Sequence, residues 1–285
     1  MQRIGLIVNH DKPTAAGTAH ALMQHARDLG MEVLACAKTV AEAGGGMACQ
    51  TEDFPGRVDA VVVLGGDGTM LNAAHRLQGS GIPLIGLNLG DLGYLTSIEA
   101  SRIQEAMRCL RDDRFTISQR AALSCRILRH NGEQFVTMDA LNDLVVSRGA
   151  SGRAVWLELS LGGVAVTTYI CDGIIVSTPT GSTAYALSAG GPIVMPETAA
   201  LVVAVICPHT LTSRPLVVPD TTVITIRVAK SSAPLVASID GQDDFSLALG
   251  EQIEVQRSPR TVPVIHLPGY DGYSVLDRKL GWGGR

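Results

Sequence analysis

One carboxylate stands among three glycines in Gly65-Gly66-Asp67-Gly68-Thr69, directly after the apolar run Val61 to Leu64. Glycines at the carboxyl end of a buried strand let a phosphate approach the backbone, and the N–H groups of a following helix then face the anion. The loop is not a Walker A motif, because no Gly-Lys-Ser/Thr follows, nor a dinucleotide fingerprint, because Leu71 replaces its third glycine. A carboxylate among phosphates is repelled unless it holds a metal or takes a proton. The pattern favours phosphate chemistry at Asp67 over a tight turn that needs glycine only for its backbone angles.

A second polar constellation runs from Asp172 to Tyr185, where an apolar strand is followed by a turn and a short helix. Five hydroxyl side chains without charge lie in it: Ser177, Thr178, Thr180, Ser182 and Thr183. Such a surface suits sugar hydroxyls, an amide or phosphate oxygens. An elaborate helix cap with a proline turn is the structural alternative, although a cap needs one hydroxyl rather than five.

Three shorter segments could be either plain turns or parts of a binding site. Asn142-Asp143 precedes a strand and could be a turn. The loop from Asn88 to Leu95 follows a strand and lies on the same edge as Asp67 if both strands share one sheet. The segment from Ser238 to Gln242 predicts a hairpin turn.

Apolar strands alternate with helical patterns in the first part of the chain, which predicts a parallel, Rossmann-like sheet covered on both faces. The expected strands are Ile4–Val8, Glu32–Ala37, Val58–Leu64 and Ile82–Leu87. The expected helices are Thr14–Leu29, Thr69–Leu77 and Ile98–Arg111, with a glycine-bearing loop at Ala43–Pro55.

The pattern changes after about Ile117 to short β-rich segments, with a helix expected only at Ser182–Ala189. The expected strands are Ala122–Leu128, Asp143–Val146, Val155–Leu161, Val164–Ile170, Ile174–Ser177, Ala200–Cys207, Thr222–Val228, Leu235–Ile239, Gln252–Gln256 and Val262–His266. We therefore predict an α/β domain over residues 1–117, a β-rich domain over 118–269, and a C-terminal segment, 270–285, that packs back on the first domain.

Composition narrows the class of protein. The net charge of -4 and the pI near 6.0 argue against a general nucleic-acid binder. No apolar run approaches the roughly 18 to 20 residues of a membrane span, and the first residues lack the pattern of a signal peptide. Six scattered cysteines without a CxxC pair favour reduced thiols over disulfides or a zinc site. We expect a soluble, cytoplasmic protein.

Taken together, these motifs resemble the NAD kinase family over most of the chain. Gly-Gly-Asp-Gly-Thr alone is shared with phosphofructokinases and with diacylglycerol and sphingosine lipid kinases. The run from Asp172 to Pro192 is similar to the family's long glycine-rich motif, and Asn142-Asp143 and Pro208–Val217 are similar to two further family segments. The resemblance implies a two-domain NAD kinase fold and transfer of the γ-phosphoryl group of ATP to the 2′-hydroxyl of the adenosine ribose of NAD, making NADP.

The resemblance also implies a role for each matching residue. Asp67 would accept the proton of the hydroxyl, and Gly68 would be a backbone contact. Asp172 would hold the nicotinamide end of NAD, and Ile170 occupies a position linked to the choice between NAD and NADH. Further dinucleotide contacts would be Asn142, Asp143, Thr180, Thr183, Ala184, Tyr185, Ser188 and Gln242.

No lysine or arginine lies inside either main motif, so the positive charge must come from a metal or from a distant residue such as Arg148, Arg153 or Arg214. Mg²⁺ or another divalent metal would neutralise the phosphates. The family commonly forms dimers or tetramers, and some bacterial members accept polyphosphate as well as ATP. Two departures from the family pattern are Asp143, the shorter of the two acids used there, and Tyr94 in place of phenylalanine.

Two other functions remain open at this stage. A lipid kinase shares the glycine loop, but the dense hydroxyls after Asp172 suit a polar dinucleotide better than an acyl chain. A non-catalytic dinucleotide sensor could share the fold, but a binding module needs no carboxylate near phosphates.

Overall fold

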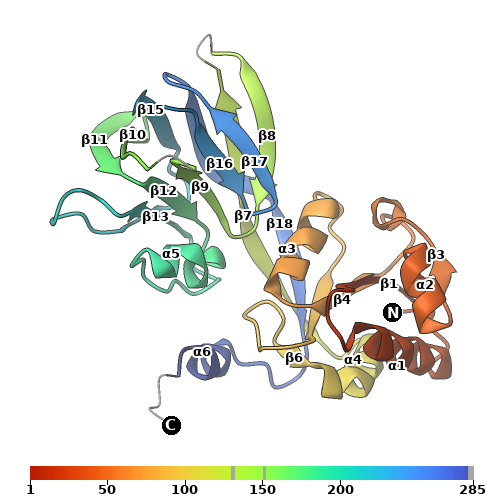
Figure 1. Ribbon diagram of the computed structural model, residues 1–285. Helices are drawn as coiled ribbons and strands as arrows, with labels where there is room; N and C mark the ends of the chain where they lie inside the picture. Colours follow the sequence, from red (N-terminus) through yellow and green to blue (C-terminus); the bar gives the residue numbers. More distant parts are fainter. Residues whose placement is uncertain (130–131, 150–151, 282–285) are drawn as a thin grey trace. The chain divides into compact units, whose positions relative to one another are not determined.

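The computed structural model describes residues 1–129, 132–149 and 152–281, and these divide into two compact units. Unit 1 comprises Met1–Gln119 and the chain from Val262 on, and unit 2 comprises Arg120–Thr261. Both are shown in Figure 1. The units change at residues 119 and 261, whereas the boundaries expected from the sequence lie at 117 and 269.

A parallel sheet with the strand order β5-β4-β1-β2-β3 forms the centre of unit 1. Its strands are β1 (Arg3–Val8), β2 (Glu32–Ala35), β3 (Met47–Ala48), β4 (Ala60–Gly65) and β5 (Leu84–Asn88). β6 (Ile98–Glu99) and the end of β18 (Gln252–His266) also pair with β5 in parallel. The helices are α1 (Ala15–Asp28), α2 (Ala37–Ala43), α3 (Asp67–Arg76), α4 (Ile103–Arg111) and α6 (Gly272–Leu280), with 3₁₀ turns at Thr51–Asp53 and Ala100–Arg102.

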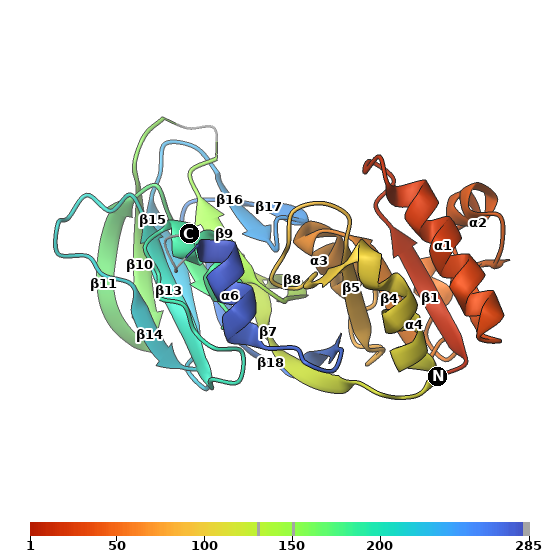
Figure 2. The same cartoon turned by 90° about the horizontal axis from the view of Figure 1, so that it is seen from below.

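Both faces of this sheet are covered, as the apolar strands predict. Val62 and Leu64 of β4 pack in one cluster with α1 and α4. The alternate residues Val61 and Val63 are fully buried on the other face, and α3 packs against β4 and β5. Figures 1 and 2 both show α2 beside α1.

The connections from β1 and β4 run in opposite directions across the sheet. β1 continues through α1 to β2 on one side, and β4 continues through α3 to β5 on the other. The carboxyl ends of β1 and β4 are therefore a topological switch point, where open α/β sheets bind ligands. This is the position of the Asp67 loop.

Unit 2 contains two antiparallel sheets around one apolar core. One has the order β14-β13-β12-β9-β16-β17, and the other contains β11-β10-β15-β18, with β7 pairing β18 and β8. The strands are β7 (Thr116–Leu128), β8 (Gln134–Ala140), β9 (Asp143–Ser147), β10 (Val155–Leu161), β11 (Val164–Cys171), β12 (Gly173–Ser177), β13 (Ala200–Ile206), β14 (Leu216–Pro219), β15 (Ile224–Lys230), β16 (Leu235–Ile239) and β17 (Asp243–Leu247). The α-helix α5 (Tyr185–Ser188) follows a 3₁₀ turn at Gly181–Thr183.

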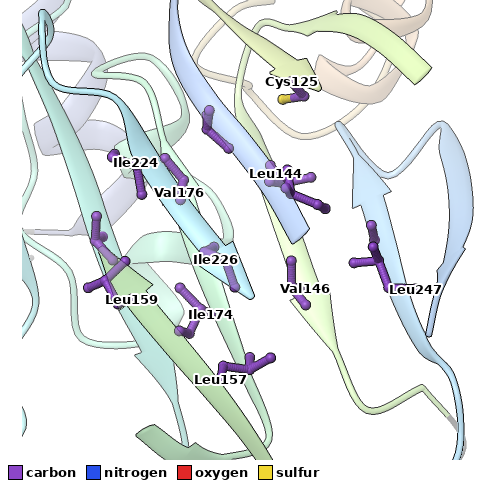
Figure 3. Packing of buried hydrophobic residues seen from close by; sticks show 14 of the residues in the cluster. Cys125, Leu144, Val146, Leu157, Leu159, Ile174, Val176, Ile224, Ile226 and Leu247 are labelled. Atoms are coloured by element: carbon purple, nitrogen blue, oxygen red, sulfur yellow. The ribbon is translucent and has the colours of Figure 1, made fainter. Parts of the chain in front are cut away.

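Alternate residues of the facing sheets fill that core. Leu157 and Ile226 of one sheet pack in the same buried cluster as Ile174 and Val176 of the other (Figure 3). The period of two along each strand places these residues inward and polar residues outward. The predicted architecture, an α/β part followed by a β-rich part, is confirmed.

Several elements differ from the prediction. The expected helix Ile98–Arg111 begins only at Ile103, and the two strands expected at 252–256 and 262–266 are one long strand, β18. The short elements α2, β8, β14 and β17 were not predicted. Helix α2 is missed because it has only seven residues and closes on Gly44, whose φ of 71° is left-handed.

Helix α6 was also missed, although its ends are marked in the sequence. The carboxylate of Asp271 accepts hydrogen bonds from the N–H groups of Tyr273 and Ser274, and Gly281 ends the helix with a φ of 66°. Only Val275 and Leu276 are buried, so the apolar pattern is too sparse to predict a helix.

We expect Leu157→Ala to lower the free energy of unfolding by about 2 to 5 kcal/mol, because it removes buried methyl groups and leaves a cavity between the sheets. Urea unfolding followed by circular dichroism measures the loss. Leu211→Ala is the matched control, since Leu211 is 96% exposed, and should change stability by less than about 0.5 kcal/mol. Equal losses in both variants would contradict the assignment of this core.

Candidate functional site

Asp67 is held by the loop that follows β5. Its Oδ2 accepts the Tyr94 N–H at 2.8 Å, and its Oδ1 accepts the N–H groups of Leu95 at 2.9 Å and Thr96 at 3.0 Å. The Thr96 hydroxyl adds a bond to Oδ1 at 3.1 Å. The expectation that the loop from Asn88 to Leu95 lies on the same edge as Asp67 is confirmed. Three backbone N–H groups and the side chains of Thr96 and Lys279 thus bind the carboxylate that the sequence places among glycines.

The sequence of the loop explains how it reaches Asp67. Asn88 donates to the Asp91 carbonyl at 2.5 Å and to the Thr96 hydroxyl at 3.0 Å, which closes the loop on itself. A Cβ on Gly93 would overlap the Oδ1 atom of Asp67, so only glycine permits this approach. The loop and the carboxylate therefore form one unit.

These contacts set the charge of Asp67. Burial alone would raise the pKa of its carboxyl, but the N–H groups of Tyr94, Thr96 and Leu95 and the positive charge of Lys279 outweigh that effect and lower the pKa. The Lys279 Nζ lies 3.3 Å from Oδ2. Asp67 is thus ionised at neutral pH. No sequence motif predicts the role of Lys279, because it lies 212 positions from Asp67 on an unpredicted helix.

The three glycines around Asp67 have different reasons to be there. A Cβ on Gly65 would overlap the Thr69 side chain, so this glycine is needed for packing. A Cβ on Gly66 or Gly68 would meet nothing within 4 Å, and neither residue has a left-handed φ. Packing and backbone angles therefore leave Gly66 and Gly68 unexplained, and an approaching ligand would explain them.

The loop after β1 contributes two further polar side chains that the sequence analysis did not single out. Asn9 donates to the Thr69 hydroxyl at 3.4 Å. The Lys12 Nζ lies 3.7 Å from where a Cβ of Gly90 would be. Their signal in the sequence is their place directly after a buried strand.

The fit of a resident divalent metal to this site is poor. No group of three or more His, Cys, Asp or Glu side chains that could hold a metal occurs in the described part of the chain. The oxygens of Asp67 already accept five hydrogen bonds, so they offer little to a metal.

A second carboxylate, Asp240, organises the predicted Asn142-Asp143 pair in unit 2. It accepts the N–H groups of Leu141 at 2.6 Å, Asn142 at 2.7 Å and Asp143 at 3.0 Å. Asp240 lies in the predicted hairpin turn between β16 and β17, with a positive φ of 51°. Asn142-Asp143 is thus more than a local turn, and Asp240 is a residue whose role the sequence analysis missed.

Most hydroxyls after Asp172 hold the backbone rather than face a ligand. Ser177 and Thr178 donate to the carbonyls of Asn142 and Leu141, and Ser182 donates to Pro179 and Val194. Thr183 donates to the Thr180 carbonyl at 3.2 Å. Ser177, Thr178 and Ser182 are buried. Their interpretation as a ligand-facing surface is therefore wrong.

A groove of about 560 Å³ lies in unit 2 beside these loops. Four predicted site residues line it, namely Asn142, Asp143, Ala184 and Tyr185. Further lining residues are Val145, Ser147, Gly149, Val236, Ser238, Asp240, Gly241 and Asp244. The structure thus brings the segments 142–147, 184–185 and 236–244 together around one groove that both polar and apolar side chains line.

The other predicted residues lie outside that lining. Thr180 is buried, Thr183 is half-buried, and Ser188 and Gln242 are exposed close to lining residues. Arg153 is exposed just before β10. Gly68 and Asp67 belong to unit 1.

Asp172 and Ile170 lie at another place in unit 2. The Asp172 carboxylate forms an ion pair with Arg148 at 3.1 Å. Ile170 lines a different cavity of about 520 Å³ together with His209 and Arg214. The Arg214 guanidinium donates to the carbonyls of Leu211 and Ser213 in its own loop. Of the three candidate cations, Arg148 therefore pairs with the predicted residue Asp172, and Arg214 shares a cavity with the predicted residue Ile170.

Asp143 has the opposite electrostatic environment from Asp67. Burial and the neighbouring charge of Asp240 raise its pKa to about 7. Its carboxyl therefore exchanges a proton near neutral pH, at the edge of the groove.

An α/β unit with a carboxylate in a strand-end glycine loop, joined to a β-rich unit with a polar groove, has the features of a phosphate-transferring enzyme. The ATP-NAD kinase N-terminal domain model matches residues 4–115, and the ATP-NAD kinase C-terminal domain model matches residues 141–267. The NAD kinase of Symbiobacterium thermophilum is 40% identical over 281 residues, which cover 98% of this chain and 99% of that protein. The NAD kinase of Syntrophotalea carbinolica is 38% identical over 100% of both chains. The chain belongs to the NAD kinase family.

Two solved structures share the fold. Yeast NADH kinase complexed with NADH matches with a TM-score of 0.92 at 24% sequence identity. The match covers 100% of this chain and 89% of the yeast chain. An NAD kinase from Archaeoglobus fulgidus in complex with ATP matches with a TM-score of 0.76 at 23% sequence identity. That match covers 100% of this chain and 98% of the Archaeoglobus chain. The two-domain NAD kinase fold is therefore confirmed.

We expect the stability of the protein to fall as the pH rises from about 4 to 7, because native Asp143 keeps a proton that the unfolded chain has released. Asp143→Asn removes this effect and should be more stable than the wild type above pH 7, by on the order of 1 to 4 kcal/mol. Urea unfolding at a series of pH values measures it. Asp244→Asn, an exposed carboxylate of the same groove, is the control. Parallel curves for Asp143→Asn and the wild type would refute the raised pKa.

Proposed function

We propose that this protein is an NAD kinase that transfers the γ-phosphoryl group of ATP to the 2′-hydroxyl of the adenosine ribose of NAD, making NADP. The observation that carries the proposal is the ionised carboxylate of Asp67, fixed at an open glycine loop in a chain that matches NAD kinases over its full length. Polyphosphate is the alternative donor.

Asp67 would accept the proton of the attacking hydroxyl. As the new oxygen–phosphorus bond forms, the bond to ADP breaks and the hydroxyl proton passes to Asp67. Phosphoryl transfer proceeds through a loose transition state, so positioning matters more than the strength of the base. A carboxylate with a lowered pKa, held rigidly by three N–H groups, suits this task.

The open backbone at Gly66 and Gly68 would receive the phosphates of the donor. Thr69 and Met70 donate their N–H groups to the Gly66 carbonyl, so the N–H groups of Asp67 and Gly68 are the ones at this helix start that would meet an anion. Mg²⁺ usually binds through substrate phosphates and water with few protein carboxylates. We therefore propose that the metal arrives with the triphosphate.

The groove of unit 2 would bind part of the dinucleotide. Asn142, Asp143, Ala184 and Tyr185 line it, and Gly68 would be a backbone contact in unit 1. The remaining contacts proposed from the family resemblance are Arg153, Ile170, Asp172, Thr180, Thr183, Ser188 and Gln242. What supports the assignment is the mixed lining, in which a few polar side chains among apolar ones suit the ribose, amide and ring groups of a dinucleotide.

The two alternative functions fit less well. The groove beside Tyr185 contains carboxylate, amide and hydroxyl groups, which an acyl chain would leave unpaired, so a lipid kinase is disfavoured. A dinucleotide sensor would need Asp67 only to anchor the loop of residues 94–96, so measured turnover separates the sensor from the kinase. No helix of the described residues is long and apolar enough to cross a membrane.

We propose a cytoplasmic location and a homodimer or homotetramer. Support for self-association comes from β11, which ends its sheet and exposes Val164, Val166 and Ile170. The net charge of -4 disfavours nucleic acid as a partner.

Asp67→Asn should lose about 100-fold to 10,000-fold in turnover while it keeps NAD binding, because the amide cannot accept the hydroxyl proton. The measurement is NADP formation from NAD, ATP and Mg²⁺, with NAD binding followed by thermal shift. If the wild type binds NAD but forms no NADP with ATP or with polyphosphate, the kinase assignment fails and a sensor is favoured.

The variant Gly68→Ala tests whether Gly68 is needed for the approach of a ligand or for the stability of the fold. We expect the variant to be as stable as the wild type or more stable by roughly 0.5 to 1 kcal/mol, because alanine favours the helix and its Cβ meets nothing. Turnover should nevertheless fall at least about tenfold, because the methyl group would stand where the phosphates approach. A stable variant with full activity would place the donor elsewhere.

A further inference from the structure

Lys279 gives the Asp67 site a positive charge that neither main motif contains. No lysine or arginine occurs in residues 65–69 or 172–185. The Nζ of Lys279 lies 3.3 Å from Oδ2 of Asp67. Phosphoryl transfer requires cations around the transferred group, since its oxygens carry the developing charge.

The sequence of α6 explains why Lys279 points to this site. Lys279 follows the buried residues Val275 and Leu276 by four and three positions, so all three share one face of the helix. Its neighbour Arg278 is exposed and donates to the Ser274 carbonyl of its own helix at 3.4 Å. Both cations are exposed, but only Lys279 reaches Asp67, and the ammonium therefore stays open to solvent and to a ligand beside the carboxylate.

The ammonium differs from the other donors to Asp67. The N–H groups of Tyr94, Leu95 and Thr96 belong to the backbone and have one hydrogen each. Lys279 has three N–H donors, and Asp67 is its one hydrogen-bond partner among the described residues. Two donors therefore remain for another group that approaches Oδ2, the only Asp67 oxygen with fewer than three bonds.

We propose that Lys279 is a catalytic residue whose ammonium bridges the Asp67 carboxylate and the phosphoryl group in transfer. The inference rests on the proposed kinase function. The acceptor hydroxyl forms the new bond to phosphorus, its proton passes to Asp67, and the bond between phosphorus and the leaving ADP oxygen breaks. Lys279 stays protonated and donates to the phosphoryl oxygens as their charge develops, so it also reduces the repulsion between Asp67 and the phosphates.

The variants Lys279→Met and Lys279→Arg test this role beside Arg278→Met. NADP formation from NAD and ATP should fall in kcat by roughly 100-fold to 1,000-fold for Lys279→Met, the usual cost of one preorganised donor. Lys279→Arg should recover part of the loss because it keeps the charge. Arg278→Met, on the same helix, should stay within about twofold of the wild type.

The pH profile separates this role from a purely structural one. Among the described residues, Lys279 is the ion-pair partner of Asp67, and the N–H donors to Asp67 are uncharged. Two further charged residues belong to the surroundings of that loop. Asp91 lies in the same loop as Tyr94, and the Nζ of Lys12 lies 3.7 Å from where a Cβ of Gly90 would be. Because the charge of Lys279 lowers the pKa of Asp67, Lys279→Met should move the acidic limb of kcat to higher pH. A structural loss would lower activity without moving that limb.

The outcomes are distinct. Loss of kcat in Lys279→Met, with unchanged NAD binding and thermal stability and a shifted acidic limb, supports the proposal. An active wild type with an equally active Lys279→Met, or a loss with no shift and no rescue by arginine, overturns it and leaves the kinase function intact. A wild type without turnover overturns the proposed function and this inference with it.

Discussion

The binding of one carboxylate by consecutive backbone N–H groups underlies the whole site. Asp67 fixes the loop of residues 94–96 in this way, and Asp240 fixes residues 141–143. Loops rich in glycine lose much conformational entropy on folding, so they need such an anchor. A charge-assisted hydrogen bond is roughly twice as strong as a neutral one, and here each carboxylate makes three at once. The anchor is thus both a structural element and, at Asp67, the proposed reactive group.

The same type of residue acquires opposite proton affinity in the two loops. Asp67 meets only donors and a cation, which lower its pKa. Asp143 is buried beside Asp240, whose negative charge raises its pKa to about 7. Asp67 and Asp240 each accept three backbone N–H groups of a loop. Among the described residues, Asp143 accepts no such N–H bond that would offset its burial. The environment, and not the residue type, therefore divides the acids into a permanent anion and a proton-exchanging group.

The fold was largely predictable because its signals are local. The buried run Val61 to Leu64 predicts a strand, and the glycines after it predict a ligand loop. The recognised motifs also identified Asn142-Asp143, which the structure brings to the groove with Tyr185. The sequence could not show that Ser177, Thr178 and Ser182 turn inward, because a hydroxyl suits a ligand or a carbonyl equally well.

Partners that are distant in the chain were beyond prediction for a different reason. Asp240 and Asn142 are 98 positions apart, and Lys279 and Asp67 are 212 apart. Such pairs are fixed by strand order and helix placement, which periodicity does not encode. The ends of the helix Gly272–Leu280 are marked in the sequence by Asp271 and Gly281, but nothing in the sequence indicates that the helix brings Lys279 to Asp67.

Unit 1 is discontinuous in sequence, and this affects how the protein is made. Its first 119 residues leave the ribosome early, but β18 and α6 follow only after all of unit 2 has been synthesised. The strand edge at β5 lacks the partner residue Val264 until then, and Asp67 lacks its cation. β6 already pairs with Leu87 and Asn88 of β5, so the part of this edge that waits for β18 is the part around Leu84. The enzyme is therefore built so that no fragment released before residue 279 possesses the assembled charge arrangement.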